Sequence, residues 1–246
     1  MPFSKRVQQV QPSQTMAITA LVDELRREGK DVLDLGAGEP DFETPEVIRE
    51  AGIRAIKEGF TKYTPASGTF ELKEAICASI KADSGIEYSP AEILITSGAK
   101  HGIINALLAL CETGDEVLIP APYWTSYPEQ VRLAEATPVI LATEEKSGFK
   151  LTPDQLDAAI NARTKLLILN SPCNPTGSVY SETEISELAK VLEKHDIFVL
   201  FDEIYAKIVY DGHKHVNLAS FPELKDRVIV INGVSKSYAM TGWRIG

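Results

Sequence analysis

The chain has few cysteines and no long apolar run, and both absences restrict its class. Three cysteines occur in 246 residues, at positions 77, 111 and 173, without a CxxC pair or the spacing of a metal site. An odd number of isolated cysteines is typical of reduced thiols in the cytoplasm. No apolar run is long enough to cross a membrane, and the N-terminus lacks the apolar region of a signal peptide. We therefore expect a cytoplasmic protein with no membrane partner.

Clustered basic charge is absent as well. The formal net charge is −10, from 25 lysines and arginines against 35 aspartates and glutamates. The sequence contains no long run of basic residues. Nucleic acids and anionic membranes bind clustered basic side chains, so neither is expected as a partner. A small anionic ligand is still compatible with this charge, because a local site can be positive inside an acidic protein.

Several motifs of metal, hydrolase and dinucleotide sites are also missing. The histidines at positions 101, 195, 213 and 215 form no HExxH motif, and no GxSxG segment is present. The stretch LGAGEPDF at 35–42 has Asp41 where a dinucleotide-binding fingerprint needs its third glycine. We therefore expect no metal site, and neither a nucleophile elbow nor a dinucleotide fingerprint is predicted.

What the sequence does contain is a regular alternation of apolar and amphipathic segments. Strands are expected at 32–35, 92–96, 116–120, 137–141, 165–170, 197–201 and 227–233, and helices at 17–30, 45–59, 69–84, 99–111, 125–134, 153–160 and 181–194. Thr44 and Pro45 have the pattern of an N-cap and a first helical residue. The strands are continuous apolar runs, which indicates a mostly parallel sheet buried on both faces. The expected fold is a three-layer α/β/α domain.

Such sheets bind ligands at the carboxyl ends of their strands, and five unusual loops follow the predicted strands: SGAK, APYW, NSPCNPTG, DEIY and GVSK. In the first loop, the free N–H groups of a helix start at Gly98 and Ala99, with Lys100, could bind a phosphate; an ordinary tight turn would also explain them. In the second, Trp124 is either a platform for an aromatic ligand or a core residue. In the third, asparagines and prolines hold the backbone in one shape.

The last two loops carry a carboxylate and a lysine. Asp202 ends an apolar strand, and Tyr205 would share its face if a helical turn begins there. Asp202 is then either the partner of a protonated ligand nitrogen or a helix N-cap. Lys236 lies among small residues and is either a solvated loop lysine or a nucleophile that forms a Schiff base with a carbonyl cofactor. Arg244 could bind the phosphate of such a cofactor with two hydrogen bonds.

Together, seven segments resemble the class I/II aminotransferases of the fold-type I pyridoxal-phosphate family, nearest to the bacterial aspartate aminotransferase branch. The segments are AGEPDF, KYTPASG, SGAKHG, PYWTSYPE, NSPCNPTG, FDEIY and VSKSYAMTGWRIG, and they span residues 30–246 in the family's order. The resemblance implies the cofactor pyridoxal 5′-phosphate and a homodimer. It also implies a ping-pong transfer, through Lys236, of the amino group of an amino acid, aspartate first, to a 2-oxo acid such as 2-oxoglutarate.

The resemblance also implies roles for single residues. Lys236 would form the Schiff base and move the proton, while Asp202 would pair with the pyridinium nitrogen. Tyr205 and Asn174 would bind the phenolic oxygen, and Trp124 would stack on the ring; Asn174 and Trp124 would also contact the substrate. The remaining contacts would come from Gly98, Ala99, Lys100, Ser235 and Arg244 at the phosphate, from Tyr63 at the phosphate of the neighbouring subunit, and from Gly38 in the substrate pocket.

The chain departs from the family at three points. Gly233 stands where many relatives carry a serine that binds the phosphate. Gln11 stands where many carry a lysine that serves long dicarboxylic substrates, which favours aspartate over prephenate. The resemblance also implies a small C-terminal domain with a carboxylate-binding arginine, and we expect these 246 residues to be an N-terminal fragment without it. We expect residues 1–30 to form an N-terminal segment with small-domain and dimer contacts, and residues 31–246 to form the cofactor-binding large domain, truncated at its C-terminal end.

Other functions are compatible with the same segments. A prephenate or aromatic aminotransferase, or a fold-type I lyase or decarboxylase, would use the same cofactor set. A lyase would form product without a 2-oxo acid acceptor. A cofactor-binding domain of a regulator and an inactive N-terminal fragment are the non-enzyme alternatives, and no DNA-binding segment is visible in the sequence.

Overall fold

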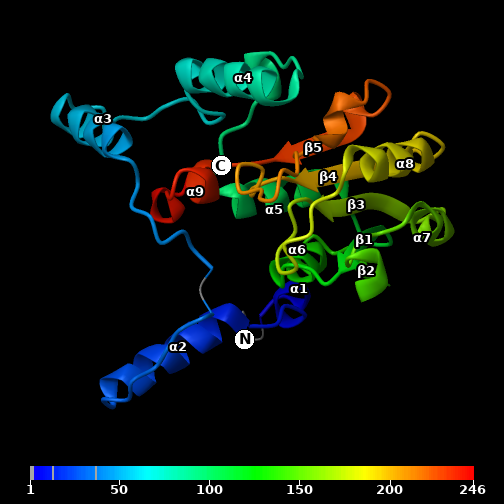
Figure 1. Ribbon diagram of the computed structural model, residues 1–246, viewed down its shortest axis with the longest axis horizontal. Helices are drawn as coiled ribbons and strands as arrows, with labels where there is room; N and C mark the ends of the chain where they lie inside the picture. The colour runs from blue at the N-terminus through cyan, green and yellow to red at the C-terminus, as the bar shows by residue number, and fades with distance from the viewer. Residues whose placement is uncertain (1–2, 13, 37) are drawn as a thin grey trace.

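The computed structural model describes residues 3–12, 14–36 and 38–246, and its centre is a parallel β-sheet (Figure 1). The strands are β1 (Glu116–Ala121), β2 (Thr137–Ala142), β3 (Thr164–Asn170), β4 (Phe198–Asp202) and β5 (Val228–Ile231). They pair in the order β2-β1-β3-β4-β5, and every pairing is parallel. The predicted parallel sheet is therefore confirmed.

The strands have apolar side chains on both faces because both faces are covered. On β4, Leu200 packs into a core with α5 (Ala99–Leu110) and α6 (Ser126–Leu133). Its neighbours Val199 and Phe201 point the other way, into a core with α7 (Pro153–Ala159) and α8 (Glu182–Leu192). Successive side chains along the strand thus pack into two separate hydrophobic cores, one on each face of the sheet. The predicted three-layer α/β/α architecture is confirmed.

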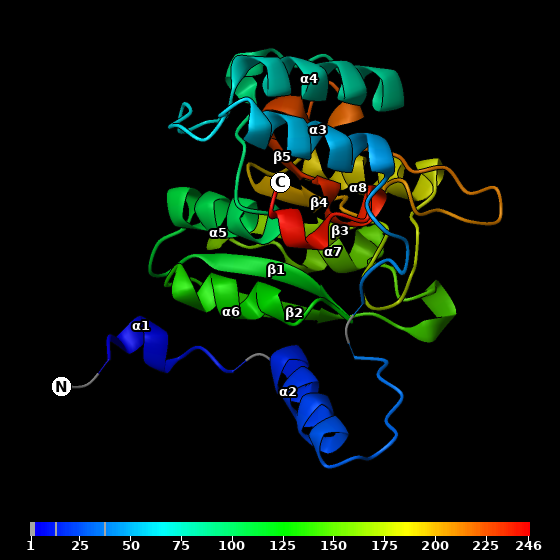
Figure 2. The same ribbon diagram turned by 90° about the vertical axis from the view of Figure 1, so that its left-hand side faces the viewer.

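The remaining elements connect or flank these layers. They are α1 (Lys5–Gln8), α2 (Gln14–Arg27), α3 (Glu46–Lys57), α4 (Phe70–Ser84), α9 (Val234–Ser237), and the 3-10 turns η1 (Pro90–Glu92), η2 (Glu145–Ser147), η3 (Leu218–Ser220), η4 (Lys225–Arg227) and η5 (Thr241–Trp243). Figure 1 shows α2 and α3 apart from the sheet and its covering helices, and Figure 2 shows α2 below them as well. Among the described residues, no helix has the length and apolar character that a membrane span requires.

Three expectations about local structure were wrong. Residues 32–35 and 92–96 are not strands: Glu92 ends η1, although Ile93 after it has an extended backbone. Thr96 exchanges two backbone hydrogen bonds with Gly246, of 2.7 and 3.1 Å, and no described residue extends that pair into a ladder. Pro45, not Thr44, is the N-cap of α3, because Pro45 has a non-helical ψ of 140°. The Thr44 hydroxyl donates to Ala239 O at 2.6 Å and accepts from Trp243 Nε1 at 3.2 Å. The GxG of the stretch at 35–42 includes residue 37, which lies outside the described residues.

Candidate active site

The loops that follow β3, β4 and β5 meet at the carboxyl edge of the sheet. The register pairs Asn170 with Asp202, and Asp202 with Ile231, so these three strands end side by side. Asp202 is the last residue of β4, and Lys236 follows β5 on the short helix α9. The parallel order therefore brings together residues that are far apart in the sequence.

Asp202 is a buried carboxylate, with 3% of its surface exposed. Its Oδ2 accepts a hydrogen bond from the Tyr127 hydroxyl at 2.7 Å, and its Oδ1 accepts one from Ile204 N at 3.0 Å. Burial raises the pKa of Asp202 to about 6, and the two hydrogen bonds oppose that rise because they stabilise the charged form. Asp202 is thus buried without a cation, and a protonated ligand nitrogen would stabilise it.

Tyr205 and Asn174 lie beside this carboxylate. Burial raises the pKa of the Tyr205 hydroxyl, the charge of Asp202 raises it further, and a hydrogen bond with the Asn174 side chain opposes both. Asn170 holds the Asn174 loop, because its Oδ1 accepts from Asn174 N at 2.8 Å and its Nδ2 donates to Asp202 O at 2.8 Å. The peptide bonds before Pro172 and Pro175 in this loop are cis. The loop after β3 is therefore tied directly to the end of β4.

Lys236 extends over the same edge from α9. Its Nζ lies 5.7 Å from the centroid of the Tyr205 ring and donates to Gly38 O. Burial lowers the pKa of Lys236, while the charge of Glu39 raises it by less. A lowered pKa increases the neutral, nucleophilic form of a lysine. The structure therefore brings Lys236, Tyr205 and Gly38 together.

The start of α5 forms the cationic side of the site. Gly98 is its N-cap, with φ of 80° and ψ of 161°, a conformation that only glycine adopts readily. A Cβ on Gly98 would lie 2.9 Å from Arg244 Cζ, and Arg244 Nη2 donates to Ser97 O at 3.4 Å. Burial, and then the charge of Arg244, lowers the pKa of Lys100. Neither cation has an ion pair with a carboxylate in the part of the chain that the structure describes, so this cup fits a phosphate dianion.

Trp124 links the two sides of the site. The Lys100 Nζ lies 4.8 Å from its ring centroid, and Tyr127 packs edge-on against it at 5.4 Å. Ser235 is buried in α9, beside Lys236. Ala99 is the first residue of α5, next to Gly98. Tyr63 is fully exposed and lies between α3 and α4, apart from the site residues that the structure brings together.

Two residues of the site, Tyr127 and Asn170, were not predicted from the sequence. Tyr127 lies three residues after Trp124, a spacing that places both on one face of the helical turn that begins α6. Asn170 is the last residue of β3, as Asp202 is of β4. The spacing from Trp124 could have pointed to Tyr127, and the end of a strand could have pointed to Asn170. Neither pattern identifies the residue that each side chain contacts in the fold.

The arrangement combines the half-buried Lys236, the buried carboxylate of Asp202 and a cationic cup at one edge. Among residues 3–12, 14–36 and 38–246, no group of three or more histidine, cysteine or acidic side chains is placed to hold a metal ion. The lysine could attack a carbonyl, the carboxylate could hold a proton on a ring nitrogen, and the cup could hold a phosphate. These are the functional groups that a phosphorylated carbonyl cofactor requires.

Known proteins resemble this chain closely along its whole length. It is 50% identical to an aspartate aminotransferase of Bacillus subtilis over 247 aligned positions, which cover 100% of this chain and 63% of that protein. It is 51% identical to an aspartate/prephenate aminotransferase of Nitrosomonas europaea, over 100% of this chain and 62% of that protein. The chain thus spans less than two thirds of the length of these relatives.

Solved structures of aspartate aminotransferases also superpose closely on this chain. The crystal structure of an aspartate aminotransferase from Rhizobium meliloti superposes with a TM-score of 0.96 at 46% identity, over 100% of this chain and 62% of that one. An aspartate aminotransferase from Thermus thermophilus, solved with maleate, superposes with a TM-score of 0.96 at 42% identity, over 100% of this chain and 64% of that one. The family model described as aminotransferase class I and II matches residues 30–246. With this match over most of its length, the chain belongs to the class I and II aminotransferase family.

Proposed function

We propose that the whole protein is a pyridoxal-phosphate-dependent aminotransferase that moves the amino group of aspartate to a 2-oxo acid such as 2-oxoglutarate. One observation carries the proposal: the half-buried Lys236, the buried Asp202 and the cup at Gly98 and Arg244 share one edge of the sheet. The relatives named aspartate aminotransferase support aspartate as the donor.

The residues present fit the cofactor at each of its polar groups. The cup of Gly98, Ala99, Lys100 and Arg244, with Ser235, would hold the phosphate, because two cations and the start of α5 face one another there. Asp202 would hold the ring nitrogen. Tyr205 and Asn174 would bind the phenolic oxygen, and Trp124 would stack on the ring. When bound, pyridoxal phosphate withdraws electrons from the Cα of the amino acid and so makes its proton removable.

The chain's own residues would then perform the proton transfers. Lys236 would be the nucleophile toward the cofactor, because burial lowers its pKa and so favours the neutral amine. The same amine would also serve as the base for the proton on the substrate Cα, because a neutral amine can accept a proton and then return it. The Asp202 carboxylate keeps a proton on the ring nitrogen, since a buried anion stabilises a cation beside it. Gly38, whose carbonyl contacts Lys236, would line the substrate pocket. A second 2-oxo acid would collect the amino group by the reverse steps.

The relative named aspartate/prephenate aminotransferase supports prephenate as a second candidate for the 2-oxo acid that accepts the amino group. Gln11, in place of a basic residue near the N-terminus, favours aspartate. In the structure, Gln11 N donates to Glu129 Oε2 at 2.7 Å, so an acidic side chain lies next to this position.

The domain boundaries and the homodimer also remain proposals. We propose that residues 1–30 make small-domain and dimer contacts and that residues 31–246 form the cofactor-binding domain. The exposed Tyr63 supports a contact with the phosphate of a second subunit, because its ring is fully accessible in the single chain. Location in the cytoplasm stays a prediction from the three isolated cysteines.

The test uses the whole protein with pyridoxal phosphate, aspartate and 2-oxoglutarate. We expect oxaloacetate to form, and a Lys236→Ala variant to lose about 1,000-fold or more in kcat, because the nucleophile and proton carrier are the same amine. The bound cofactor should also lose the Lys236-dependent absorbance band near the visible edge. Lys146→Ala is the matched control, since Lys146 is exposed and pairs with Glu144 away from the site.

Three results would contradict the proposal. Absence of turnover with every amino acid donor would reject a transaminase. Steady product formation without a 2-oxo acid would indicate a lyase or decarboxylase. An absorbance band that persists in Lys236→Ala would assign the Schiff base to another lysine.

A further inference from the structure

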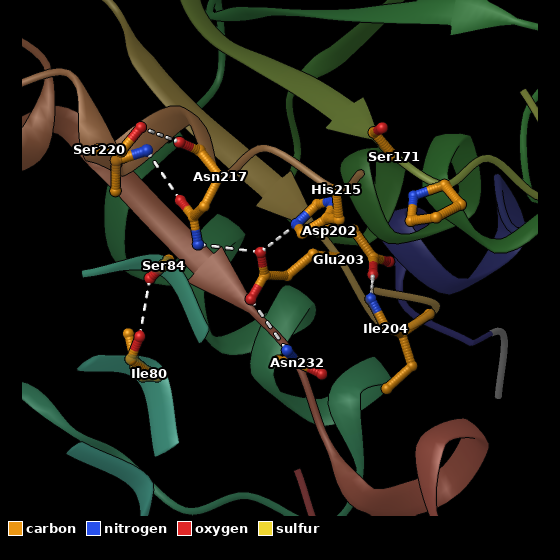
Figure 3. Close-up of polar contacts among 12 residues, drawn as sticks. Ile80, Ser84, Ser171, Asp202, Glu203, Ile204, His215, Asn217, Ser220 and Asn232 are labelled. Carbon is orange, nitrogen blue, oxygen red and sulfur yellow. Dashed lines mark hydrogen bonds and ion pairs between the residues drawn. The ribbon is translucent and has the colours of Figure 1, made fainter. Parts of the chain in front are cut away.

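Glu203 directly follows Asp202, yet it has no part in the proposed chemistry. Its surface is 6% exposed, so its carboxylate is buried almost as fully as that of Asp202. The two side chains point to opposite faces of the sheet, as neighbours at a strand end do. Asp202 contacts Tyr127 on the α6 side, whereas Glu203 contacts Asn217 beside the other core (Figure 3).

The Glu203 carboxylate accepts hydrogen bonds from two other segments of the chain. His215 Nε2 and Asn217 Nδ2 approach Oε2 at 2.7 and 2.9 Å, both from the connection that precedes η3. Asn232 Nδ2 donates to Oε1 at 2.9 Å from the end of β5 (Figure 3). The backbone adds a fourth bond, since Glu203 N donates to Ile231 O at 2.9 Å. Glu203 therefore joins β4, β5 and the 213–220 connection.

Each of the three donors is itself held in place. Asn217 caps η3, since its Oδ1 accepts from Ala219 N at 2.8 Å. The His215 ring stacks on the Phe201 ring of β4, with centroids 5.9 Å apart and planes 21° apart. Its Nδ1 is buried without a hydrogen-bond partner among the described residues, so the bond to Glu203 is the one that orients the ring. The donors are thus preorganised around the carboxylate.

Asn232 connects this cluster to the lysine. Its Oδ1 accepts from Gly233 N at 2.7 Å, and Gly233 is the N-cap of α9, which carries Lys236. On the other side, Glu203 is bonded covalently to Asp202. One connection between Asp202, which would hold the ring nitrogen, and the helix of Lys236 therefore runs through the side chain of Glu203, beside the backbone pairing of β4 with β5.

We propose that Glu203 is a positioning residue of the active site: by accepting from Asn232, His215 and Asn217, it sets the position of the Lys236 helix relative to Asp202. The inference rests on the proposed function, because it concerns the two residues that would act on the cofactor. Small misplacements of reacting groups reduce rates far more than they reduce binding.

The decisive variant is Glu203→Gln. A glutamine has one acceptor where the carboxylate has two, so in either orientation its amide meets another amide donor. If its oxygen faces Asn232, its NH2 meets Asn217 Nδ2, and Asn217 cannot rotate without losing its bond from Ala219 N. If its oxygen faces Asn217, its NH2 meets Asn232 Nδ2, and Asn232 cannot rotate without losing its bond from Gly233 N.

A second variant separates positioning from folding. Asn232 is exposed as a residue, so Asn232→Ala removes the link to α9 without opening a core cavity. Asp157→Asn is the matched control: Asp157 Oδ1 accepts from His195 Nε2 at 2.9 Å, the same carboxylate–imidazole contact on the surface between α7 and the end of α8.

The measurements use the whole protein loaded with pyridoxal phosphate. We expect Glu203→Gln and Asn232→Ala to lower kcat for aspartate about 10- to 100-fold while KM changes by less than about 3-fold. We also expect both to raise the Kd for pyridoxal phosphate and to shift the absorbance maximum of the bound cofactor. Asp157→Asn should match the wild type in all four quantities.

The outcomes separate this inference from the proposed function. If the wild type shows no transamination, the proposed function fails. If the wild type is active and both cluster variants keep its kcat, cofactor Kd and absorbance, the inference is wrong, even if Glu203→Gln lowers the melting temperature. If Asn232→Ala is as stable as the wild type but slower in kcat, the positioning role is supported independently of folding.

Discussion

At the scale of single residues, the pair of Asp202 and Tyr127 decides whether the site has a charged carboxylate. The two residues are 75 positions apart in the sequence, and their side chains meet at 2.7 Å. Burial raises the pKa of Asp202 to about 6, close to the pH at which the site would operate. Tyr127 acts in the opposite direction, because its hydroxyl donates to the charged form. The ionisation of Asp202 at neutral pH therefore depends on a residue outside the DEIY segment.

Replacement of Tyr127 by phenylalanine tests this dependence. The change removes a hydrogen bond that lowers the pKa of Asp202, so that pKa should rise further above its ordinary value, and less of the carboxylate is ionised at pH 7. We expect the acidic limb of the kcat/KM profile to move to higher pH by about 1 unit. The measurement is the pH dependence of transamination in the whole protein, from pH 5 to 9.

Tyr180→Phe is the control for that experiment. Tyr180 is equally buried, but its hydroxyl accepts a hydrogen bond from Leu151 N at 2.7 Å and does not contact Asp202. This variant should lose about 1 kcal/mol of stability without a change in the pH profile. If Tyr127→Phe also leaves the acidic limb in place, Tyr127 does not control the ionisation of Asp202.

At the scale of elements, the start of α5 combines a backbone requirement with a charge requirement. Sequence analysis predicted the helix at 99–111 and its anion-binding start, and α5 occupies Ala99–Leu110. The close approach of Arg244 to Gly98 was not predictable, because 146 residues separate them and only the fold brings them together. Glycine is needed there for two reasons: its positive φ, and the absence of a Cβ beside the guanidinium.

A pair of glycine variants compares these two reasons at two positions of positive φ, Gly98 with a ψ of 161° and Gly85 with a ψ of 0°. Gly98→Ala should place a Cβ against Arg244 and displace it, which raises the Kd for pyridoxal phosphate about 10-fold or more. Gly85→Ala, at the C-cap of α4, has a similar φ of 73° but no atom within 4 Å of the added Cβ. It should lose about 1 kcal/mol of stability with the Kd unchanged. Equilibrium titration measures both, and equal Kd values in the two variants would exclude the steric explanation.

At the scale of the whole molecule, the sheet and the N-terminal segments differ in how much they are packed. Leu166 and Leu167 on the central strand β3 have no exposed surface, whereas Leu33 and Leu35 are 86% and 88% exposed. Amides open locally in proportion to the loss of buried contacts and hydrogen bonds. The single chain should therefore be stable at its sheet and open readily along residues 31–35.

Hydrogen exchange of the 246-residue chain tests this difference. We expect amides of residues 31–35 to exchange within seconds, because the described residues provide them with no helix or ladder partners, and amides of β3 to exchange at least about 1,000-fold more slowly. Peptide-level mass spectrometry gives both rates in one sample. Comparable protection of the two segments would show that 31–35 pack more firmly than their exposure indicates.

The apolar runs of the sequence were sufficient to predict the five strands of the sheet and their burial on both faces, since that pattern depends on local composition. The end of each strand then predicted where chemistry should lie, and the loops with Asp202, Asn174 and Lys236 do meet at that edge. Residues 32–35 and 92–96 look equally strand-like, but a strand also needs a neighbouring ladder, which no local pattern reveals.

Tertiary structure alone decided how the side chains at that edge are paired. It placed Asp202 against Tyr127 and Glu203 against His215, on opposite faces of one strand end. It also brought Arg244 to Gly98. The reason is physical: residue type sets what a group can donate, accept or ionise, whereas its partner, burial and pKa depend on chain segments that only folding brings within hydrogen-bond distance.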